Sequence, residues 1–521
     1  MQTEKNSLQR INLVWILLAA FSFVIRRPYL YDASYQWRSI HTEMTAYWFV
    51  REGINLINYQ TPLFGPPWQI PIEFPLFQAT AAIIFRTGLG NLDFACRLTA
   101  LLYFYLSALI LYLLCKKIFF DRRISVITLS LYLFLPFNIQ YSTEPLIDYL
   151  ALALALSYFY FILLWLDTRS SFWNALLATI FGSLTMLVKP TTMPVVVVPI
   201  VVFVLKDILV IYGKDFKPPF NLKSVFDKVW TERFYWFTLL MMAVLPLSIG
   251  SIWTRHADLI KGRSVFTAWH TSQAMVNWYF GTWSLRMDQH VWADHISEAE
   301  RLFLPYGLSL FAILGMFVAM DLIPFPQEAT QTRLFILSFI AGLGVTLAIF
   351  LPLYQQQYYF VAFSASMAIF GGYGLARFWQ LSQTKGYIFI FVFVLWAMIF
   401  LAFNLKDYNM QRTIAVTENR KLEKMMTWAQ KVQTYVPFDK WVVVVEYDWD
   451  PSYVYPLQRK AMVVTPRELG KPICQVLADE HFSLVVVADR SYARNEELLN
   501  YAFQCFKAEK EVLPGVFAVT H

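Results

Sequence analysis

Long apolar segments recur along this chain of 521 residues, and they constrain its fold more than any other feature. About eleven of them contain enough consecutive apolar residues to cross a hydrocarbon layer roughly 30 Å thick as helices. Hydrophobic residues make up 57% of the chain and charged residues 15%, and a water-soluble domain could not bury that much apolar surface. We therefore predict a mostly α-helical, polytopic membrane protein. The predicted crossings are residues 8–25, 95–115, 124–142, 146–166, 172–188, 191–212, 234–253, 302–322, 334–352, 359–379 and 387–404.

The basic residues predict how these crossings are oriented. The first crossing follows Lys5 and Arg10 and lacks a small-x-small cleavage site, which indicates a retained signal anchor with its N-terminus in the cytoplasm. An odd number of crossings then places the C-terminus, His521, outside the cell membrane. Most Lys- and Arg-bearing links between crossings fall on the inner side, as the positive-inside bias requires. These links account for the net charge of +7, so we do not expect nucleic-acid binding.

Two outer loops are long, residues 26–94 and 254–301, and both are rich in Trp, Tyr, Arg and His. Because they are too apolar to be free in water, we expect parts of each to lie along the membrane as short helices. The stretch "EFPLFQATAAIIFRTG" in the first loop is too short and interrupted for a crossing, so we predict a re-entrant or interfacial helix there. The motif "GGYG" at 371–374 lies in a crossing and follows no strand, which indicates helix packing.

Residues 407–521 have a different character from the 1–406 transmembrane domain. Short runs of β-branched residues alternate there with segments of helical periodicity, and a length of about 115 residues is enough for a small domain. We therefore predict an extracytoplasmic α/β domain that shapes the entrance for an acceptor. The predicted strands are "WVVVVEY", "AMVVT" and "SLVVVAD", and the predicted helices are "ENRKLEKMMTWAQKVQTYV", "PRELGKPICQVLADE" and "RNEELLNYAFQCF".

The four cysteines do not follow a metal-binding pattern. Cys96 and Cys115 lie in apolar segments, where a buried, inert thiol is expected. Cys474 and Cys505 lie in the polar tail and could pair if that tail is extracytoplasmic. A zinc site would have to come from the histidines, but no pair of them has the i,i+4 spacing of a tight helical site. The histidines considered are His41, His256, His270, His290 and His295.

Acidic residues at membrane depth on the outer side are few, and each is therefore informative. Asp32, Glu43, Glu52 and Glu73 lie in the first outer loop. Glu144 and Asp148, in the short second loop, are four residues apart at a predicted helix start, so we expect them to share one helix face. The alternative interpretation is that these two acids cap the helix dipole.

Cations on the same side indicate an anionic ligand. Lys189 ends a crossing, and its ammonium is well suited to a lipid phosphate, although a snorkelling lysine at a helix end would have the same sequence. Arg27 either neutralises an anionic ligand or snorkels at the interface. The second long loop adds cationic and aromatic side chains, which predict a pocket for an anionic headgroup with an attached ring. These side chains are Arg255, His256, Lys261, Arg263, His270, Trp278 and Arg286.

The order of these motifs resembles the C-type glycosyltransferase superfamily (GT-C fold), near the protein O-mannosyltransferases and aminoarabinose transferases. The resemblance spans most of the chain, and each motif is loose. It rests on "D…WR…HTEM…A…F…EG…EFPLFQA", "RLTALLYFYLSALILYLLCKKIF", "STEPLIDYLAL", "GSLTMLVKPT", "WYFGTW", "QQQYYF" and "EYDWDPSYVYPLQRKAMV".

The resemblance implies inverting transfer of a sugar from a polyprenyl-phosphate donor to an acceptor at the outer membrane face. Its catalytic base is an acid of the first outer loop, here Asp32, with Glu43 second. The sequence departs from the family's usual Asp–Glu pair, and His41 stands where related sequences carry an aspartate. The second-loop acid corresponds to Glu144 or Asp148, and the donor-phosphate lysine to Lys189. We expect further donor-phosphate contacts from Arg27, Arg255, His256, His270 and Arg286, and acceptor or sugar contacts from Arg38, His41, Glu73, Trp278, Gln357 and Tyr358.

The chemistry of sugar transfer from a polyprenyl phosphate agrees with the residue types expected at this site. A neutralised polyprenyl phosphate is a fair leaving group, so the reaction needs a carboxylate to accept the acceptor proton and fixed cations to face the departing phosphate. Asp32 together with Glu144 or Asp148 could also hold a divalent metal ion through oxygen atoms. The alternatives are a non-catalytic transporter of lipid-linked saccharides, and a polymerase or ligase that uses the same donor. The identities of the sugar and of the acceptor (glycan, lipid or protein) stay open.

Overall fold

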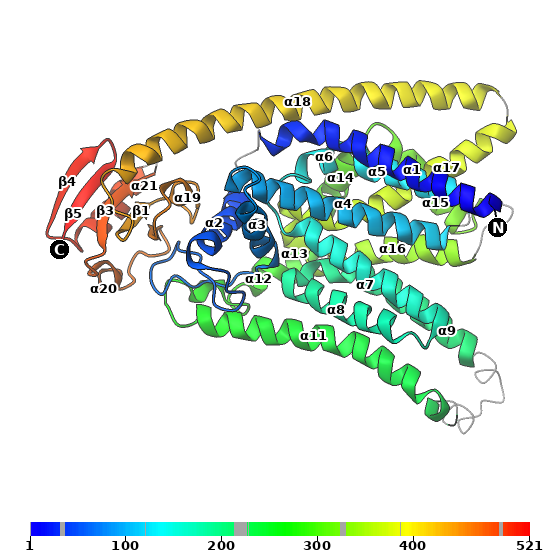
Figure 1. Cartoon of the computed structure of the whole chain (residues 1–521), viewed down its shortest axis with the longest axis horizontal. Helices are drawn as coiled ribbons and strands as arrows, with labels where there is room; N and C mark the ends of the chain where they lie inside the picture. Colours follow the sequence, from blue (N-terminus) through cyan, green and yellow to red (C-terminus); the bar gives the residue numbers. More distant parts are fainter. Residues whose placement is uncertain are drawn as a thin grey trace.

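The computed structural model describes residues 2–31, 37–119, 121–212, 227, 229–323, 330–385, 387–488 and 493–521. The molecule is elongated, with a bundle of roughly parallel and antiparallel helices and a small β-sheet at one end (Figure 1). The N-terminus lies at the opposite end of the bundle from the sheet. This is the architecture of a multi-span membrane protein, and each of the predicted crossings coincides with helical structure.

The bundle and its first outer loop contain the following helices. Before the second long loop they are α1 (Gln2–Arg26), η1 (Arg27–Leu30), α2 (Trp37–Glu52), α3 (Leu76–Arg86), α4 (Leu92–Ile118), α5 (Arg122–Phe134), α6 (Pro136–Tyr141), α7 (Asp148–Thr168), α8 (Phe172–Val188), η2 (Pro190–Thr192), α9 (Met193–Tyr212) and α11 (Arg233–Lys261). After it begins they are η3 (Ala268–His270), α12 (Val276–Phe280), α13 (Trp283–Met287), α14 (Gln289–Phe303), α15 (Leu308–Ala319), α16 (Thr330–Ile349), η4 (Leu351–Gln355), η5 (Gln357–Phe363), α17 (Ser364–Lys385) and α18 (Tyr387–Gln433).

Fewer helices than predicted are long enough to cross a membrane unaided. Within the part of the chain that the structure describes, seven helices have the length and hydropathy for a crossing, or eight if the bent pair α14 and α15 forms one span. The predicted count of about eleven is therefore not confirmed. One reason is visible in residues 124–142, where a break before Pro136 divides the segment into α5 of 13 residues and α6 of 6. At 1.5 Å per residue, neither piece reaches across a hydrocarbon core.

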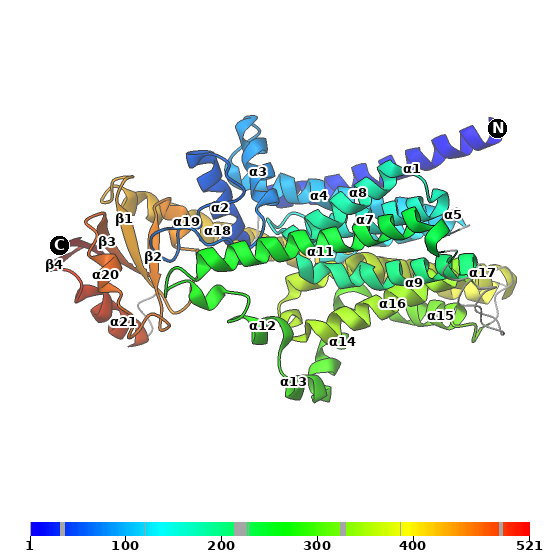
Figure 2. The same ribbon diagram turned by 90° about the horizontal axis from the view of Figure 1, so that it is seen from below.

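The long outer loops fold as short helices, as their composition predicts. The interfacial helix expected in the first loop is α3, which has only 11 residues and packs against α2 and α4. In the second loop α11 continues to Lys261, so the non-spanning part begins later than residue 254. Helices α12 and α13 project away from the bundle axis (Figure 2).

The "GGYG" motif packs helices together, as predicted. It lies in α17, where Gly372 and Gly374 allow close approach of neighbouring helices. A Cβ atom at Gly374 would collide with the Phe311 carbonyl of α15, and one at Gly372 would collide with Thr128 of α5. Only a residue without a side chain lets these three backbones pack at this distance.

The tail forms a five-stranded mixed sheet in the order β2-β1-β3-β5-β4. The three predicted strands are its parallel half, because β1 pairs in parallel with both β2 and β3. The sequence prediction did not include the other two strands, β4 and β5, which form an antiparallel hairpin. The strands are β1 (Trp441–Val445), β2 (Ala461–Val464), β3 (Phe482–Val487), β4 (Ala508–Leu513) and β5 (Val516–Thr520).

Two helical predictions for the tail need correction. The segment "PRELGKPICQVLADE" contains only one helical turn, α20 (Cys474–Leu477), because Pro472 and Gly470 interrupt it. The last crossing and the first tail helix are a single helix, α18, of 47 residues, which runs along the bundle edge into the domain (Figure 1). The tail also contains α19 (Val454–Leu457) and the predicted helix α21 (Ala493–Phe503).

The first outer loop attaches the tail domain to the bundle through backbone hydrogen bonds. The Ala461 N–H donates to the Pro62 carbonyl at 3.2 Å, and the Val463 N–H donates to the Leu63 carbonyl at 2.8 Å. Because β2 is the edge of the sheet, this loop covers an otherwise unpaired strand. The domain is therefore docked at the end of the bundle where the first loop carries its charged residues.

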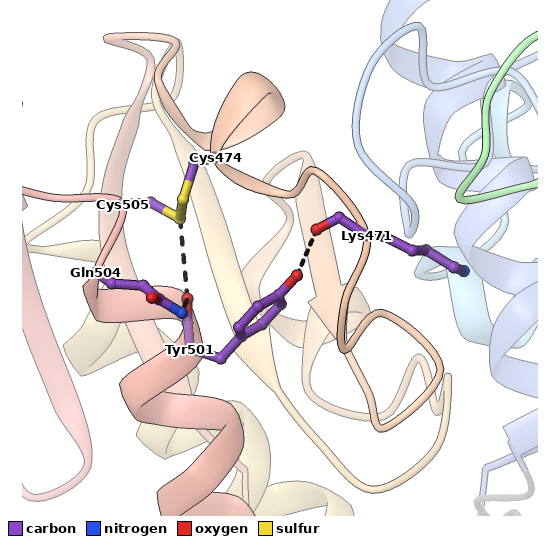
Figure 3. The surroundings of a disulfide bond; sticks show 5 residues. All are labelled: Lys471, Cys474, Tyr501, Gln504 and Cys505. Carbon is purple, nitrogen blue, oxygen red and sulfur yellow. Dashed lines mark hydrogen bonds between the residues drawn. A yellow bond between two sulfur atoms is a disulfide. The ribbon is translucent and has the colours of Figure 1, made fainter.

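A disulfide bond joins Cys474 and Cys505, the pair that the sequence allowed (Figure 3). It links the turn of α20 to the end of α21, across 31 residues of sequence. Beside it, the Tyr501 hydroxyl donates to the Lys471 carbonyl, while the Lys471 side chain points away from the disulfide (Figure 3). Cys96 and Cys115 are buried free thiols, as expected.

Candidate functional site

Helix α2 presents different polar residues on two faces. Arg38 and His41 are three residues apart and face the segment that enters α3, whereas Ser39 and Glu43 are four apart and face α4 and the turn before α7. Most of the helix is buried, although its sequence is polar for a membrane protein. Its polar side chains therefore need partners inside the protein.

Arg38 forms an ion pair with Glu73. Its Nη2 lies 2.6 Å from Glu73 Oε2, and Gln78 Nε2 donates to the other carboxylate oxygen at 2.8 Å. The Tyr59 hydroxyl donates to the Glu73 carbonyl at 2.6 Å, which fixes the backbone of this segment. The Glu73 carboxylate is thus held by two donors, and its position beside α2 orients the Arg38 guanidinium.

His41 is a buried hydrogen-bond donor with no partner among the described residues. Arg38 Nη1 lies 3.0 Å from His41 Nδ1, and since a guanidinium only donates, Nδ1 accepts and the proton of the neutral ring resides on Nε2. No side chain or carbonyl accepts from Nε2. Burial, and secondarily the Arg38 charge, lowers the pKa of His41 well below its usual value. His41 is therefore a neutral N–H donor here.

Lys189 lies where α8 ends, at the same end of the bundle. Its ammonium forms an ion pair with Asp148, the first residue of α7. The ring centres of Tyr359 and Tyr358, both in η5, lie 4.1 Å and 5.1 Å from Lys189 Nζ. The side chain is 11% exposed, so it does not snorkel freely into water. Arg38, Lys189 and the two tyrosines form what we call the cationic cluster.

Glu144 and Asp148 do not share a helix face, contrary to the prediction. Helix α7 begins at Asp148, so Glu144 lies in the preceding turn and its carboxylate points elsewhere. Ser39 Oγ of α2 donates to Glu144 Oε2 at 3.0 Å. Glu144 also lines a cavity of about 630 Å³ between α6, α14 and α18, whereas Asp148 is paired with Lys189.

Glu43 faces away from the cationic cluster. Its carboxyl is 3% exposed, and one of its oxygen atoms has no hydrogen-bond partner among the described residues. Burial raises the pKa of Glu43 well above its usual value, with Asp93 and Glu144 adding to the effect and Arg97 opposing it. A raised pKa strengthens a carboxylate as a proton acceptor, so Glu43 stays the second choice for the base. Asp32, the first choice for the base, lies outside the described residues.

The cationic residues of the second long loop do not converge on one pocket. Arg255 is exposed and lines a separate cavity of about 520 Å³, and His256 Nε2 lies 3.3 Å from the Ile57 carbonyl. Arg286 donates to the Ala348 and Ile349 carbonyls at the end of α16, at 3.2 Å and 3.0 Å. Trp278 is 41% exposed. The N-terminal Arg27 is exposed at the start of η1.

His270 and His41 meet instead at an aromatic contact with the tail domain. Both rings pack edge-on against Trp449, with centres 4.8 Å and 5.8 Å away. Burial, followed by the charges of Lys261, His41, Arg467 and Arg38, lowers the pKa of His270 well below its usual value. The rings of two neutral histidines therefore contact the tail domain at Trp449, beside α2.

Gln357 connects the two sides of this region. It begins η5 next to Tyr358, donates to Glu298 Oε1 at 2.9 Å and accepts from the Tyr141 hydroxyl at 3.2 Å. It also lines the cavity that Glu144 faces. Sequence reasoning missed Tyr359 and the charged residues of α14 and α18 around this cavity. The second tyrosine of "QQQYYF" was the available signal for the former.

The described side chains do not supply a metal cage. No group of three or more His, Cys, Asp or Glu residues in the described ranges is placed to hold a metal ion. The carboxylates considered for a divalent ion have other partners, since Asp148 binds Lys189 and Glu144 accepts from Ser39. The histidines considered for zinc are dispersed in the same way, with His295 Nε2 lying 2.9 Å from the Leu351 carbonyl.

Comparisons with known proteins identify the fold. Residues 70–212 match the model of the family described as dolichyl-phosphate-mannose-protein mannosyltransferase. The structure is similar to that of ArnT from Cupriavidus metallidurans bound to undecaprenyl phosphate, with a TM-score of 0.63 and 12% identity over 96% of this chain and 97% of that one. It also resembles the archaeal oligosaccharyltransferase AglB from Archaeoglobus fulgidus in complex with an inhibitory peptide and a dolichol-phosphate. That match has a TM-score of 0.53 and 13% identity, over 97% of this chain and 74% of AglB. No curated protein sequence matches significantly.

Proposed function

We infer that the function of this protein follows from its GT-C fold, with its multi-span membrane bundle and small C-terminal sheet. We propose that the protein is an inverting glycosyltransferase that moves a sugar from a polyprenyl-phosphate donor to an acceptor hydroxyl at the extracytoplasmic face. The observation that carries the proposal is the cationic cluster, where buried Lys189 and Arg38 lie at one end of the bundle. ArnT and AglB, which have the same fold, were solved with polyprenyl-type phosphates.

The cluster suits a phosphate chemically. Lys189 and Arg38 bring two positive charges into a region of low exposure, where fixed cations stabilise an anion more than they do in water. Their partners Asp148 and Glu73 keep both cations in place before a ligand arrives. The unpartnered Nε2–H of His41 adds a neutral donor on the same side of α2. Such a cluster stabilises the negative charge that grows on a departing polyprenyl phosphate.

In the proposed reaction, the acceptor oxygen attacks the anomeric carbon as the bond from that carbon to the phosphate oxygen breaks. The polyprenyl phosphate leaves with the bonding electrons, and a carboxylate takes the proton of the acceptor hydroxyl. The proposal assigns this proton to Asp32 and gives Glu144 the role of orienting the acceptor. Glu43 is the second choice for the base, because its carboxyl faces away from the cationic cluster.

Two features support an extracytoplasmic site. The Cys474–Cys505 disulfide lies in the tail domain, on the same end as the cationic cluster, and disulfides persist in oxidising compartments. At the opposite end of the bundle, Lys117 pairs with Asp167, and Arg169 pairs with Asp207. Basic residues at that end agree with the positive-inside bias.

The alternatives are a transporter and a polymerase or ligase of lipid-linked saccharides. A transporter would have polar residues distributed along a path through the spans, whereas the polar groups described here gather at one end. A polymerase or ligase would share the donor site. It would differ only in the acceptor.

The test is an assay in proteoliposomes with polyprenyl-phosphate sugars that carry a radiolabel. We expect the label to leave the lipid and free polyprenyl phosphate to accumulate. Lys189→Ala should weaken donor binding by about 1.5–3 kcal/mol, the range for a hydrogen bond to a charged group. Lys206→Ala, in α9, is the matched control and should leave binding unchanged. Movement of intact donor across the bilayer without transfer would contradict the proposal and favour a transporter.

A further inference from the structure

The lining of the cavity that Glu144 faces contains neither Arg38 nor Lys189 of the cationic cluster. The cavity has a volume of about 630 Å³, within the usual range for a small-ligand site, and lies between η1, α6, α14 and α18. The α18 residues that line it begin at Asp407, just beyond the apolar part of that helix, so the cavity lies at the edge of the membrane. It shares Ser297 and Gln357 with a more open cavity beside α14, so a ligand longer than one ring could extend along the groove.

The charge of this cavity is opposite to that of the cationic cluster. Its acidic residues are Glu144, Glu300 and Asp407. These three acids outnumber its one cation, Arg301, whose Nε and Nη2 donate to the two carboxylate oxygens of Glu298 at 2.8 Å and 2.5 Å. A phosphate or another anion would be repelled here. The charge of the cavity therefore selects against an anionic ligand.

The rest of the lining suits a carbohydrate. Gln140 and Gln411 can each donate and accept hydrogen bonds, as hydroxyl groups require, and Gln411 Oε1 has no partner among the described residues. Tyr29, Phe137 and Tyr306 supply aromatic surface. The negative face of an aromatic ring attracts the positively polarised C–H groups of a sugar face.

The cavity meets the cationic cluster at two points. Glu144 accepts from Ser39, the residue next to Arg38 in α2. On the other side, Gln357 lines the cavity, while the next two residues of η5, Tyr358 and Tyr359, contact the Lys189 ammonium. A molecule in the cavity would therefore contact one side of Glu144, while Arg38 and Lys189 would lie on the other side of Glu144.

From these contacts we propose that the cavity binds the acceptor of the reaction and that the group it binds is an uncharged carbohydrate. Glu144, at the inner end, orients the accepting hydroxyl toward the donor side. This inference rests on the proposed function and names its acceptor class.

The test uses the full chain carrying Gln411→Cys, whose thiol reacts with a maleimide. Cys96 and Cys115 are buried and Cys474 and Cys505 are bonded to each other, so they do not compete for the reagent. The probes are short neutral oligosaccharides, hexuronate oligosaccharides of the same length and a Ser/Thr-rich peptide. We expect the neutral oligosaccharides alone to slow labelling several-fold. Met287→Cys, on the exposed residue of α13, is the control and should label at an unchanged rate.

A variant with two fewer acidic residues in the cavity tests whether charge repels the hexuronate probe. Adding Glu300→Gln and Asp407→Asn should allow the hexuronate probe to protect the Gln411→Cys thiol, because the repulsion is removed. Protection by the peptide, or no protection by any neutral oligosaccharide, would overturn the inference. Donor binding with Lys189→Ala is measured separately. If donor transfer holds and protection fails, only the acceptor assignment is wrong; if protection holds and donor transfer fails, the proposed function is wrong.

Discussion

Arg38 and Lys189 are positive charges that the protein holds in place with its own carboxylates. Because Glu73 and Asp148 serve as these partners, neither is free to act as a general base. Glu43 differs from both, since its carboxyl faces away from the cationic cluster and burial raises its pKa well above the usual value. Among the first- and second-loop acids in the described residues, Glu144 is the one that lines a cavity.

Variants of three acids test these roles. We expect Asp32→Asn to lower turnover at least about 10²-fold with donor binding nearly unchanged, as for loss of a general base. Glu144→Gln should raise the KM for the acceptor more than it lowers kcat.

Glu43→Gln, which mimics the protonated acid, should keep turnover. Single-turnover rates and acceptor titrations check these outcomes. If Glu144→Gln is inactive at saturating acceptor while Asp32→Asn is active, the base is Glu144.

His41 and His270 predict a pH dependence of stability. Their pKa values are lowered in the folded protein, so below about pH 6.5 the unfolded chain binds protons that the folded chain cannot. Stability is therefore lost as pH falls below about 6.5, and each of the two histidines contributes to the loss. The cations facing them, Arg38, Lys261 and Arg467, act in the same direction.

Thermal unfolding between pH 7.5 and 5.5 measures this effect. His270→Gln should flatten the decline of Tm with falling pH, while His290→Gln, at an exposed position, should leave it unchanged. An identical decline in all three proteins would show that other groups govern the acid sensitivity.

At the scale of elements, two devices hold the tail domain. The first loop adds a strand-like segment to the edge of β2, and the Cys474–Cys505 disulfide closes a loop between α20 and α21. The first device joins the domain to the bundle, whereas the second stabilises the domain itself. The long helix α18 connects both parts without a flexible link.

The disulfide predicts a stability loss confined to the tail. Closing a loop of 31 residues lowers the entropy of the unfolded chain, which corresponds to about 3–4 kcal/mol. The Cys474→Ser/Cys505→Ser variant should therefore make the tail sensitive to protease at a lower temperature while α4 and α7 stay protected. Limited proteolysis followed by mass spectrometry measures this. Reduction of the unmodified protein should reproduce the effect, and no change with either treatment would contradict the prediction.

At the scale of the whole molecule, the two ends of the bundle differ in chemistry. One end carries ion pairs such as Lys117 with Asp167, and the other carries the cationic cluster, the cavity lined by Glu144 and the tail domain. Such a separation requires a fixed orientation in the membrane. The first prediction from it concerns the termini.

We expect His521 to be extracytoplasmic and Lys117 cytoplasmic. An alkaline phosphatase fused after His521 should be active, because the enzyme folds only outside the cytoplasm. A cysteine at Lys117 should resist an impermeant thiol reagent in intact cells and react in inverted vesicles. An inactive C-terminal fusion, with a fluorescent protein folding at the same place, would reverse the predicted topology.

The sequence by itself determined the membrane class, the helical segments, the three parallel strands and the cysteine pair that could bond. These features depend on local hydropathy and periodicity, which neighbouring residues reveal. Arg38, Glu73, Glu144 and Lys189 were also recognisable as unusual charges at membrane depth.

Tertiary structure decided which of these residues act together. Glu73 pairs with Arg38 from 35 residues away, Asp148 pairs with Lys189 across 41, and Glu144 accepts from Ser39 across 105. Spacing alone placed Glu144 with Asp148 on one helix face, but α7 begins only at Asp148. The residues that line the cavity beside Glu144 come from η1, α6, α14 and α18, so no local pattern could predict it. Partners distant in sequence are chosen by how helices pack, and that packing is a property of the whole chain.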